Sequence, residues 1–303
     1  MAKHEKFVEE GSMIFPYTLV ISGAILCTIA LIESYLQVTK SPMTLLEIAH
    51  QYGVLVQYNH ALEPNRGIWH PIAWVGSTFF CLMMLYSVRK HFSFMYGLGP
   101  LRHWLNVHMW LGIVATVFVT THTTYKIGGL VSISFWSMIL VAGSGVIGRY
   151  IYIQIPRGIS GNELRVDEIK EIMTEINQEI EQYALEDQNI LHYFEQISGP
   201  KKDPDMWVGK AVFLMMANDI GNFWRMMKIR RELRHNDNID HHIRKRLIKL
   251  IHEKGGLVRS SNFLAASQSL LHYWHVFHKP FAIIMFVIMF LHIGIYYLFR
   301  ANA

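Results

Sequence analysis

The chain has 303 residues, 51% of them hydrophobic and 17% charged, and a formal net charge of +5 at pH 7. Its mean hydropathy of +0.21 is too high for a soluble protein unless the apolar residues are concentrated in membrane-spanning runs. The two cysteines form no CxxC, CxxCH or iron–sulfur spacing, and no glycine-rich nucleotide motif occurs, which argues against covalent haem, an iron–sulfur cluster, a flavin or a nicotinamide on this chain.

Five apolar runs are long enough to cross a bilayer as helices. They occupy roughly 13–36, 68–88, 104–125, 131–153 and 275–299, and a hydrocarbon core about 30 Å thick needs about 20 such residues. The first run is longer than a typical signal core and follows an acidic leader, so we expect it to be retained. The sequence predicts an all-α integral membrane bundle of about five transmembrane helices, with helices one to four in 1–156 and the fifth in 272–303.

The segment 157–271 is predicted to be a soluble, helical insert between the fourth and fifth spans. Helices are expected over 167–195, 207–235 and 240–254, the last ended by Gly255 and Gly256. Residues 157–205 hold twelve acids and five bases, whereas 206–270 hold five acids and twelve bases. Three interpretations stay open: an acidic helix face packs on a basic one, residues 223–246 lie on anionic headgroups, or the insert docks an acidic redox partner.

Five spans place the two termini on opposite sides of the membrane and make the third and fifth spans parallel. Basic residues are concentrated on the N-terminal side, at Arg89, Lys90, Arg102, Arg149, Arg157 and Lys279, against Lys40, Arg66, Lys126 and Arg300 on the other. The positive-inside rule therefore places the N-terminus and the insert in the cytoplasm and the C-terminus opposite, in a bacterial-type inner membrane.

Two histidine pairs lie inside the third and fifth runs. His108 and His122 are fourteen residues apart, and so are His278 and His292. Fourteen residues make nearly four helical turns and about 21 Å of rise, so the members of a pair share one helix face at two depths. Ionisable residues inside a membrane indicate function. Parallel spans would place His108 with His278 and His122 with His292, as axial ligands of two non-covalent haem b groups.

Further residues are candidates for the same sites. His275 is an alternative to His278, but its seventeen-residue separation from His292 leaves a misalignment of about 100°. His103 lies on nearly the opposite helix face from His108, so it is not counted as a ligand. Gly112 and Gly145 could let a flat macrocycle approach the helix backbone, or they could serve helix packing. Arg149 and Lys126 could pair with haem propionates, or their side chains could reach lipid headgroups. These four residues are the further cofactor-binding candidates.

A second cluster lies near the start of the second span. His70, His60 and Glu63 are placed where a quinone could exchange protons as well as electrons. His70 is also a candidate ligand for an additional haem. The structural alternative is an interfacial aromatic belt formed with Trp69 and Trp74.

Three segments carry a family resemblance: RHWLNVHMWLGIVATVFVTTHTTYK, SGVIGRYIYIQIPRG and LLHYWHVFHKPFAIIMFVIMFLHIGIYY. Over about 104–157 and 268–299, the chain resembles di-haem b-type cytochrome subunits of membrane redox complexes, an arrangement shared with cytochrome bc complexes and ferric-reductase-type membrane domains. The resemblance implies ligand roles for His108, His122, His278 and His292, and iron–sulfur or multihaem c-type partner subunits. The chain departs from ferric reductases in having no flavin or nicotinamide domain, and its insert is unusually long.

These features favour the hypothesis that the chain is an electron-transfer subunit between a quinone pool and partner redox subunits. Membrane lipid is a further expected partner, and nucleic acid is not expected to bind. Whether the chain is itself quinone-reactive, and so part of an enzyme site, stays open. One alternative is a transmembrane ferric or other metal reductase relay. The other is a histidine-lined metal-ion transporter, although a single cation site would need its ligands at one depth.

Overall fold

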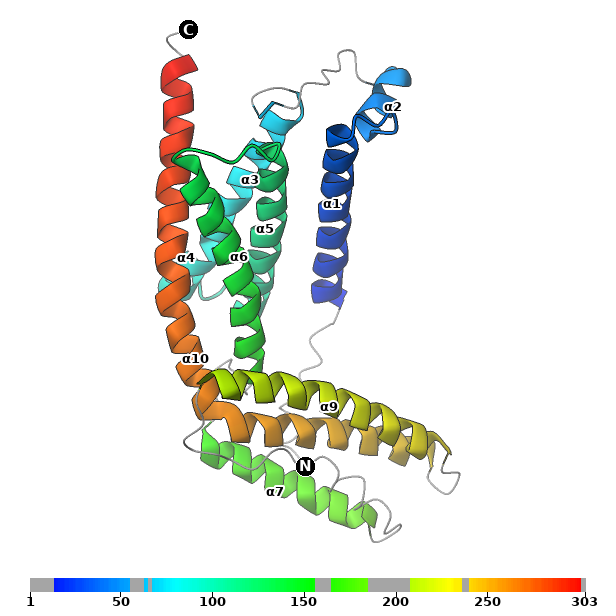
Figure 1. Cartoon of the computed structure of the whole chain (residues 1–303). Coiled ribbons are helices and arrows are strands. Elements are labelled where there is room, and N and C mark those ends of the chain that lie inside the picture. Colours follow the sequence, from blue (N-terminus) through cyan, green and yellow to red (C-terminus); the bar gives the residue numbers. More distant parts are fainter. Residues whose placement is uncertain are drawn as a thin grey trace. The chain divides into compact units, whose positions relative to one another are not determined.

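The computed structural model describes residues 14–54, 63–64, 67–155, 165–184, 208–235 and 240–300. Within these ranges the regular elements are helices and no strand occurs, which confirms the all-α class (Figure 1). In chain order they are α1 Ile14–Val38, α2 Leu45–Gln51, α3 Trp69–Met83, α4 Leu85–His91, a 3₁₀ turn Ser93–Met95, α5 Leu101–His122, α6 Val131–Gln154, α7 Val166–Ala184, α9 Val208–His235 and α10 His241–Arg300.

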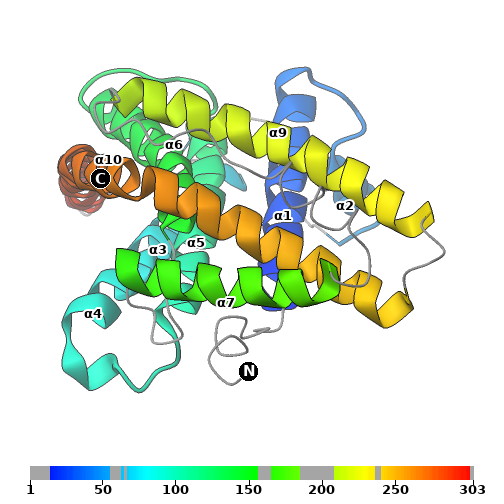
Figure 2. The same ribbon diagram turned by 90° about the horizontal axis from the view of Figure 1, so that it is seen from below.

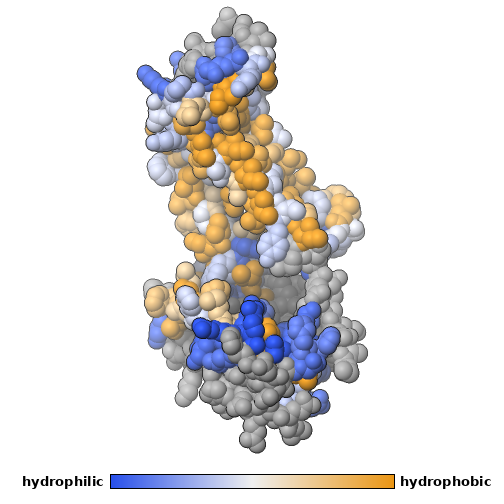
Figure 3. Space-filling view, turned by 90° about the vertical axis from the view of Figure 1, so that its right-hand side faces the viewer, coloured by the Kyte–Doolittle hydropathy of each residue, from blue (hydrophilic) through white to orange (hydrophobic). Residues whose placement is uncertain are grey.

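Five helical segments in the described ranges are long and apolar enough to span a membrane. They are Ile14–Val38, Trp69–His91, Leu101–His122, Val131–Gln154 and Ala266–Phe299. The prediction of a membrane bundle with about five spans is therefore confirmed. Apolar side chains gather on the face of the span helices that Figure 3 shows, as expected for helices whose surroundings are lipid.

The chain divides into two compact units, each described by itself. The bundle unit comprises Glu10–Ile147 and His275–Ala303, and the insert unit comprises Gly148–Trp274. Helices α6 and α10 each contribute to both units, since the division falls inside them.

Helix α10 is one continuous element of 60 residues. The prediction that Gly255 and Gly256 end a helix is therefore wrong. Two glycines inside a helix cost about 1 kcal/mol each, but the residues on both sides of them are anchored, because Leu250, Ile251 and Leu264 lie in a buried core. Burying one such side chain contributes about 1.5–3 kcal/mol, so packing outweighs the local preference of glycine.

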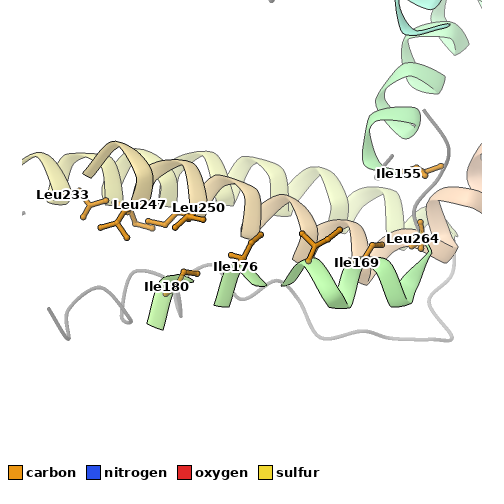
Figure 4. Packing of buried hydrophobic residues seen from close by; sticks show 11 residues of the cluster. Ile155, Ile169, Ile176, Ile180, Leu233, Leu247, Leu250 and Leu264 are labelled. Carbon is orange, nitrogen blue, oxygen red and sulfur yellow. The ribbon is translucent and has the colours of Figure 1, made fainter. Parts of the chain in front are cut away.

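The core of the insert unit lies between α7, α9 and the first part of α10. Figure 2 shows α10 between the other two helices, and Figure 4 shows isoleucines of α7 and leucines of α9 and α10 meeting there. Ile169, Ile172, Ile176 and Ile180 follow helical spacing and are at most 8% exposed, so they form one apolar stripe. This unit is therefore held mainly by an apolar core.

One ion pair links the acidic and the basic helices of the insert unit. The Arg246 guanidinium donates to both Glu179 carboxylate oxygens, at 2.6 and 2.7 Å. This hydrogen bonding raises the pKa of Arg246 above its ordinary value, as a charge-assisted bidentate pair should. The interpretation that acidic and basic helix faces pair is thus supported at this position. The apolar core contributes more to the stability of the unit than this ion pair does.

Small residues allow close helix crossings in the bundle unit. A Cβ on Gly23 of α1 would come within 2.9 Å of Trp110 Nε1 on α5, and one on Gly76 of α3 within 3.0 Å of Val119 Cγ2. Both α1 and α3 therefore approach α5 closely at glycines, which is the usual packing of membrane helices. These crossings fix the rotation of α5, the helix that contains the first histidine pair.

Helix α2 was not expected from the sequence, and a buried carboxylate anchors it. Glu33, near the end of α1, is 7% exposed and accepts hydrogen bonds from the Leu45 amide at 2.7 Å and from Gln37 Nε2 at 2.9 Å. A carboxylate on the first amides of a helix satisfies donors that have no intrahelical partner. Glu33 therefore has a structural role in joining α2 to α1.

Candidate functional site

The four histidines of the sequence prediction line two cavities in the bundle unit. His108 and His278 line the first cavity, together with Gly112 and Gly145. His122 and His292 line the second cavity, together with Lys126. The structure thus brings the histidines together in the combination that parallel third and fifth spans require.

Both histidines of α5 have the same environment at the Nδ1 atom. His108 Nδ1 lies 2.9 Å from the Met83 carbonyl oxygen, and His122 Nδ1 lies 3.0 Å from the Trp69 carbonyl oxygen. A carbonyl only accepts, so each Nδ1 carries the hydrogen and the lone pair lies on Nε2. His122 also has a backbone contact with Pro64, which lines the second cavity. The two carbonyls are also fourteen residues apart, because α3 runs antiparallel to α5.

The break between α3 and α4 explains why the Met83 carbonyl accepts from a histidine. At this break the amides of Ser87 and Val88 both donate to the Met84 carbonyl, at 2.9 and 3.2 Å. The Ser87 amide, which would bond to Met83 in an unbroken helix, is used elsewhere. The Met83 carbonyl is therefore available to the His108 ring, so the helix break orients a candidate ligand.

His278 has its Nδ1 atom oriented by a hydroxyl group of α6. Ser144 Oγ lies 3.0 Å from the Val141 carbonyl oxygen and 2.8 Å from His278 Nδ1. The single hydroxyl hydrogen is directed to the carbonyl, so Oγ accepts from the ring and His278 has the same tautomer as the α5 histidines. The adjacent Gly145 has no side chain, and a Cβ there would lie 3.8 Å from His278 Cε1.

His292 differs from the other three histidines. It lines the second cavity but is exposed, and no hydrogen bond of its ring is found within the described part of the chain. His122, the other histidine of this cavity, donates a hydrogen bond from Nδ1 to the Trp69 carbonyl. The second pair therefore combines one oriented imidazole with one that is less restrained.

The four histidines have the donor chemistry of haem-iron ligands, and the two cavities differ in size. Neutral imidazoles suit iron, and metal-bound histidines almost always donate their second ring N–H to a carbonyl or similar acceptor. The second cavity has a volume of about 360 Å³, within the usual range for cofactor pockets. The first has about 40 Å³, and a macrocycle there would have to displace flexible methionines, which change rotamer readily: Met83, Met109 and Met138.

An apolar partition separates the two cavities. Phe80 and Met138 line both of them and are 3% and 2% exposed. They belong to a buried cluster that also includes Phe135 and Met285. The walls of the two cavities therefore share buried apolar side chains.

Several candidates of the sequence prediction do not line either cavity. Arg149 belongs to the insert unit, and its guanidinium lies over the Tyr152 ring at 5.7 Å. His275 is not among the residues that line the first cavity, whereas His278 is. His103 packs edge-on against Phe15 of α1 at 5.0 Å, which agrees with its exclusion as a ligand.

The remaining two candidates lie at the cavities in different ways. Gly112 lines the first cavity, and a Cβ there would lie 3.5 Å from Met83 Sδ. Lys126 lines the second cavity and is exposed. It follows a turn in which Thr124 and Tyr125 have φ of 47° and 62°, a left-handed conformation that costs energy for residues other than glycine.

His70 lies at the second cavity rather than in a pocket of its own. It lines that cavity, and its ring contacts Trp74 and Tyr296, with centroids 6.1 and 5.2 Å apart. Of the two tryptophans in the aromatic-belt alternative, Trp74 contacts the His70 ring, whereas Trp69 is 2% exposed. Glu63 is not among the residues lining the cavity, and His60 lies outside the described residues.

The sequence did not indicate the groups that orient the histidine rings. Two of them are main-chain carbonyls, of Met83 and Trp69, and such groups leave no signal in the side-chain pattern. Ser144 lies in the glycine-rich stretch GSGVIG, and its polar side chain inside an apolar span could have been noticed. Within the described residues, no group of three or more His, Cys, Asp or Glu suited to a metal ion is found.

No protein-family model, curated protein or solved structure matches this chain.

Proposed function

We propose that the chain is a di-haem b-type cytochrome subunit that transfers electrons across a membrane, between a quinone pool and partner redox subunits. One observation carries the proposal. Two pairs of histidines line two neighbouring apolar cavities, and three of the four rings hold Nδ1 on an acceptor. This leaves Nε2 as the only nitrogen available to a ligand.

The residues of the first cavity would hold one haem through His108 and His278, and those of the second would hold another through His122 and His292. Haem supplies reversible one-electron chemistry when bound. The chain's own residues fix the ring tautomers, exclude water through the apolar walls, and present Lys126 as a cation to a propionate. With both histidines of a pair bound to the iron, no position would remain for oxygen.

We assign quinone exchange to the aromatic end of the second cavity. His70 lies there between Trp74 and Tyr296, and an imidazole can take up or release a proton near neutral pH. Quinol oxidation releases protons together with electrons, so a proton-exchanging group beside the cavity suits that chemistry. A role of His70 as an additional haem ligand is the competing assignment.

The proposed location is the inner membrane of a bacterial type of cell, with the insert unit in the cytoplasm. Basic residues flank the spans mainly on that side. The proposed partners are the iron–sulfur or multihaem c-type subunits that the resemblance to di-haem cytochrome b subunits implies. The chain itself has two cysteines and no haem-attachment motif. The part of the insert unit between the spans Val131–Gln154 and Ala266–Phe299 is the candidate platform for such a subunit.

Electron transfer across sealed vesicles tests the proposal. The haem-loaded chain is reconstituted into phospholipid vesicles that enclose ferricyanide, and dithionite is added outside. We expect the enclosed ferricyanide to be reduced much faster than in protein-free vesicles, because the two haems connect the two faces. A rate equal to that of empty vesicles would contradict the proposal.

The matched control is the variant with His122→Ala and His292→Ala, which keeps the first histidine pair. It should lose most of the transmembrane rate. A short-chain quinol that reduces the wild-type haems would support quinone exchange. Reduction of external ferric complexes without any quinone would instead favour the metal-reductase alternative.

A further inference from the structure

Helix α9 of the insert unit has an apolar face that is exposed. Phe213, Ile220 and Trp224 are 71%, 61% and 62% exposed. At 100° per residue, the large exposed apolar side chains of α9 fall within an arc of about 100°. We call this set the α9 apolar face, and it consists of Phe213, Met216, Ile220, Phe223, Trp224 and Met227.

The opposite side of α9 already forms the contact with the core of the insert unit. Met215, Ile229 and Leu233 are 1%, 0% and 0% exposed, and the latter two pack in the cluster shared with α7 and α10. A helix on the surface of a soluble domain buries one apolar stripe and exposes a polar one. Helix α9 instead has two apolar sides, so a second apolar environment must cover the outer one.

The charges of α9 indicate what that environment is. Six Lys or Arg residues stand against two Asp or Glu residues in Val208–His235, and the bases are concentrated toward its C-terminal end. Arg231 and Arg234, both exposed, fall on the same arc as the α9 apolar face, just beyond Met227. Aromatic and aliphatic side chains followed by arginines on one face are typical of a helix at the boundary between anionic headgroups and acyl chains.

The insert unit is joined to membrane-spanning helices at both of its ends. Helix α6 enters the insert unit directly from the span Val131–Gln154, and α10 leads out of that unit into the span Ala266–Phe299 without a break. Both helices that the two units share therefore include part of a membrane-span segment.

We propose that the α9 apolar face inserts into the lipid headgroup–acyl boundary of the membrane that the chain spans, with its arginines on anionic headgroups. The aromatic rings supply rigid apolar area at the depth where tryptophan is favoured. The long arginine side chains reach the phosphate layer. This proposal concerns the insert unit and does not depend on bound haem.

A site-specific fluorescent label tests the proposal in the full chain. The only cysteines, Cys27 and Cys81, are replaced by serine, and Phe223→Cys is labelled with an environment-sensitive dye. The protein is placed in nanodiscs of phosphatidylcholine with phosphatidylglycerol. We expect nitroxide groups at a shallow acyl position to quench the dye, and aqueous iodide to quench it little.

The matched control is Gln178→Cys, at an exposed position of α7 in the same unit. Iodide should quench this label and nitroxide lipids should not. Ile220→Cys provides a second position on the face if the first variant folds poorly. Exchanging Arg231→Gln and Arg234→Gln should reduce lipid quenching at position 223 in discs containing the anionic lipid, and leave it unchanged in neutral discs.

Equal iodide quenching at positions 223 and 178 would overturn the proposal, since the face would then be in water. Protection from both quenchers, with disulfide cross-linking of Phe223→Cys between two chains, would also overturn it and would show that a second copy covers the face. Protection that appears only after addition of a partner subunit would assign the face to that protein instead.

Discussion

Replacing His122 and His292 together by alanine should leave about one haem b per chain where the wild type binds about two. The second cavity would lose both imidazoles, whereas the first would keep His108 and His278 with their partners Met83 and Ser144. A pyridine haemochrome assay, scaled to protein concentration, measures this loss. The remaining absorbance should belong to a single b-type species, because one site is intact.

The controls use histidines that line neither cavity. His103→Ala, against Phe15, and His275→Ala should keep the full haem content. The double replacement His108→Ala with His278→Ala should remove the other haem. Haem content unchanged in either double variant would show that the ligand assignment is wrong, and loss in the His275→Ala variant would move the ligand from His278 to His275.

Ser144→Ala should weaken haem binding at the first site by about 10–100-fold, the usual effect of removing a hydrogen-bond partner of a metal-bound histidine. The substitution removes the oxygen that accepts from His278 Nδ1 at 2.8 Å. The His278 ring would then lose its fixed tautomer and orientation. Transfer of haem to apomyoglobin measures the change, and the redox potential of the first haem should shift with it.

Ser134→Ala is the matched control for this variant. Ser134 lies on the same helix, α6, and donates to the Met285 carbonyl of α10 at 3.0 Å, so its loss also removes a hydrogen bond between these helices. Ser134 lines the second cavity and not the first, so the two variants are compared only for haem binding at the first site. Equal weakening in both variants would indicate general loosening of α6 against α10, which would contradict a positioning role for Ser144.

The pairing of the histidines could be predicted from the sequence, for two physical reasons. The spacing of fourteen residues repeats the helix face, and the third and fifth spans run parallel because one span lies between them. Neither reason needs the details of packing. The same elements therefore bring His108 to His278 and His122 to His292 in the structure.

The partners of the histidine rings could not be predicted in the same way. The Met83 carbonyl accepts from His108 because the helix breaks at Met84, and no proline or glycine marks this break. The Trp69 carbonyl depends on the antiparallel register of α3 and α5, which Gly76 and Val119 fix through close contact. Register and main-chain acceptors arise from tertiary packing, which a pattern of residue types does not specify.

Local propensity also misled the prediction at Gly255 and Gly256. Their helix-breaking tendency is about 1 kcal/mol each, whereas Leu250 and Leu264 on either side are buried in the core of the insert unit. Tertiary packing therefore extends α10 across them. The α9 apolar face, in contrast, could have been recognised in the sequence, because its residues from Phe213 to Met227 follow helical spacing. The high charge of 223–246 led to interpretations of the insert that rest on charge alone.

The haem content of the purified wild-type chain tests the central proposal most directly. The chain is extracted in detergent, and a pyridine haemochrome assay is combined with a dithionite-reduced spectrum. We expect about two non-covalent b-type haems per polypeptide, because the structure contains two histidine pairs in two cavities. A chain that is fully folded, has been supplied with haem and binds none would contradict the proposal, and the intramembrane histidines would then be candidates for a cation pathway.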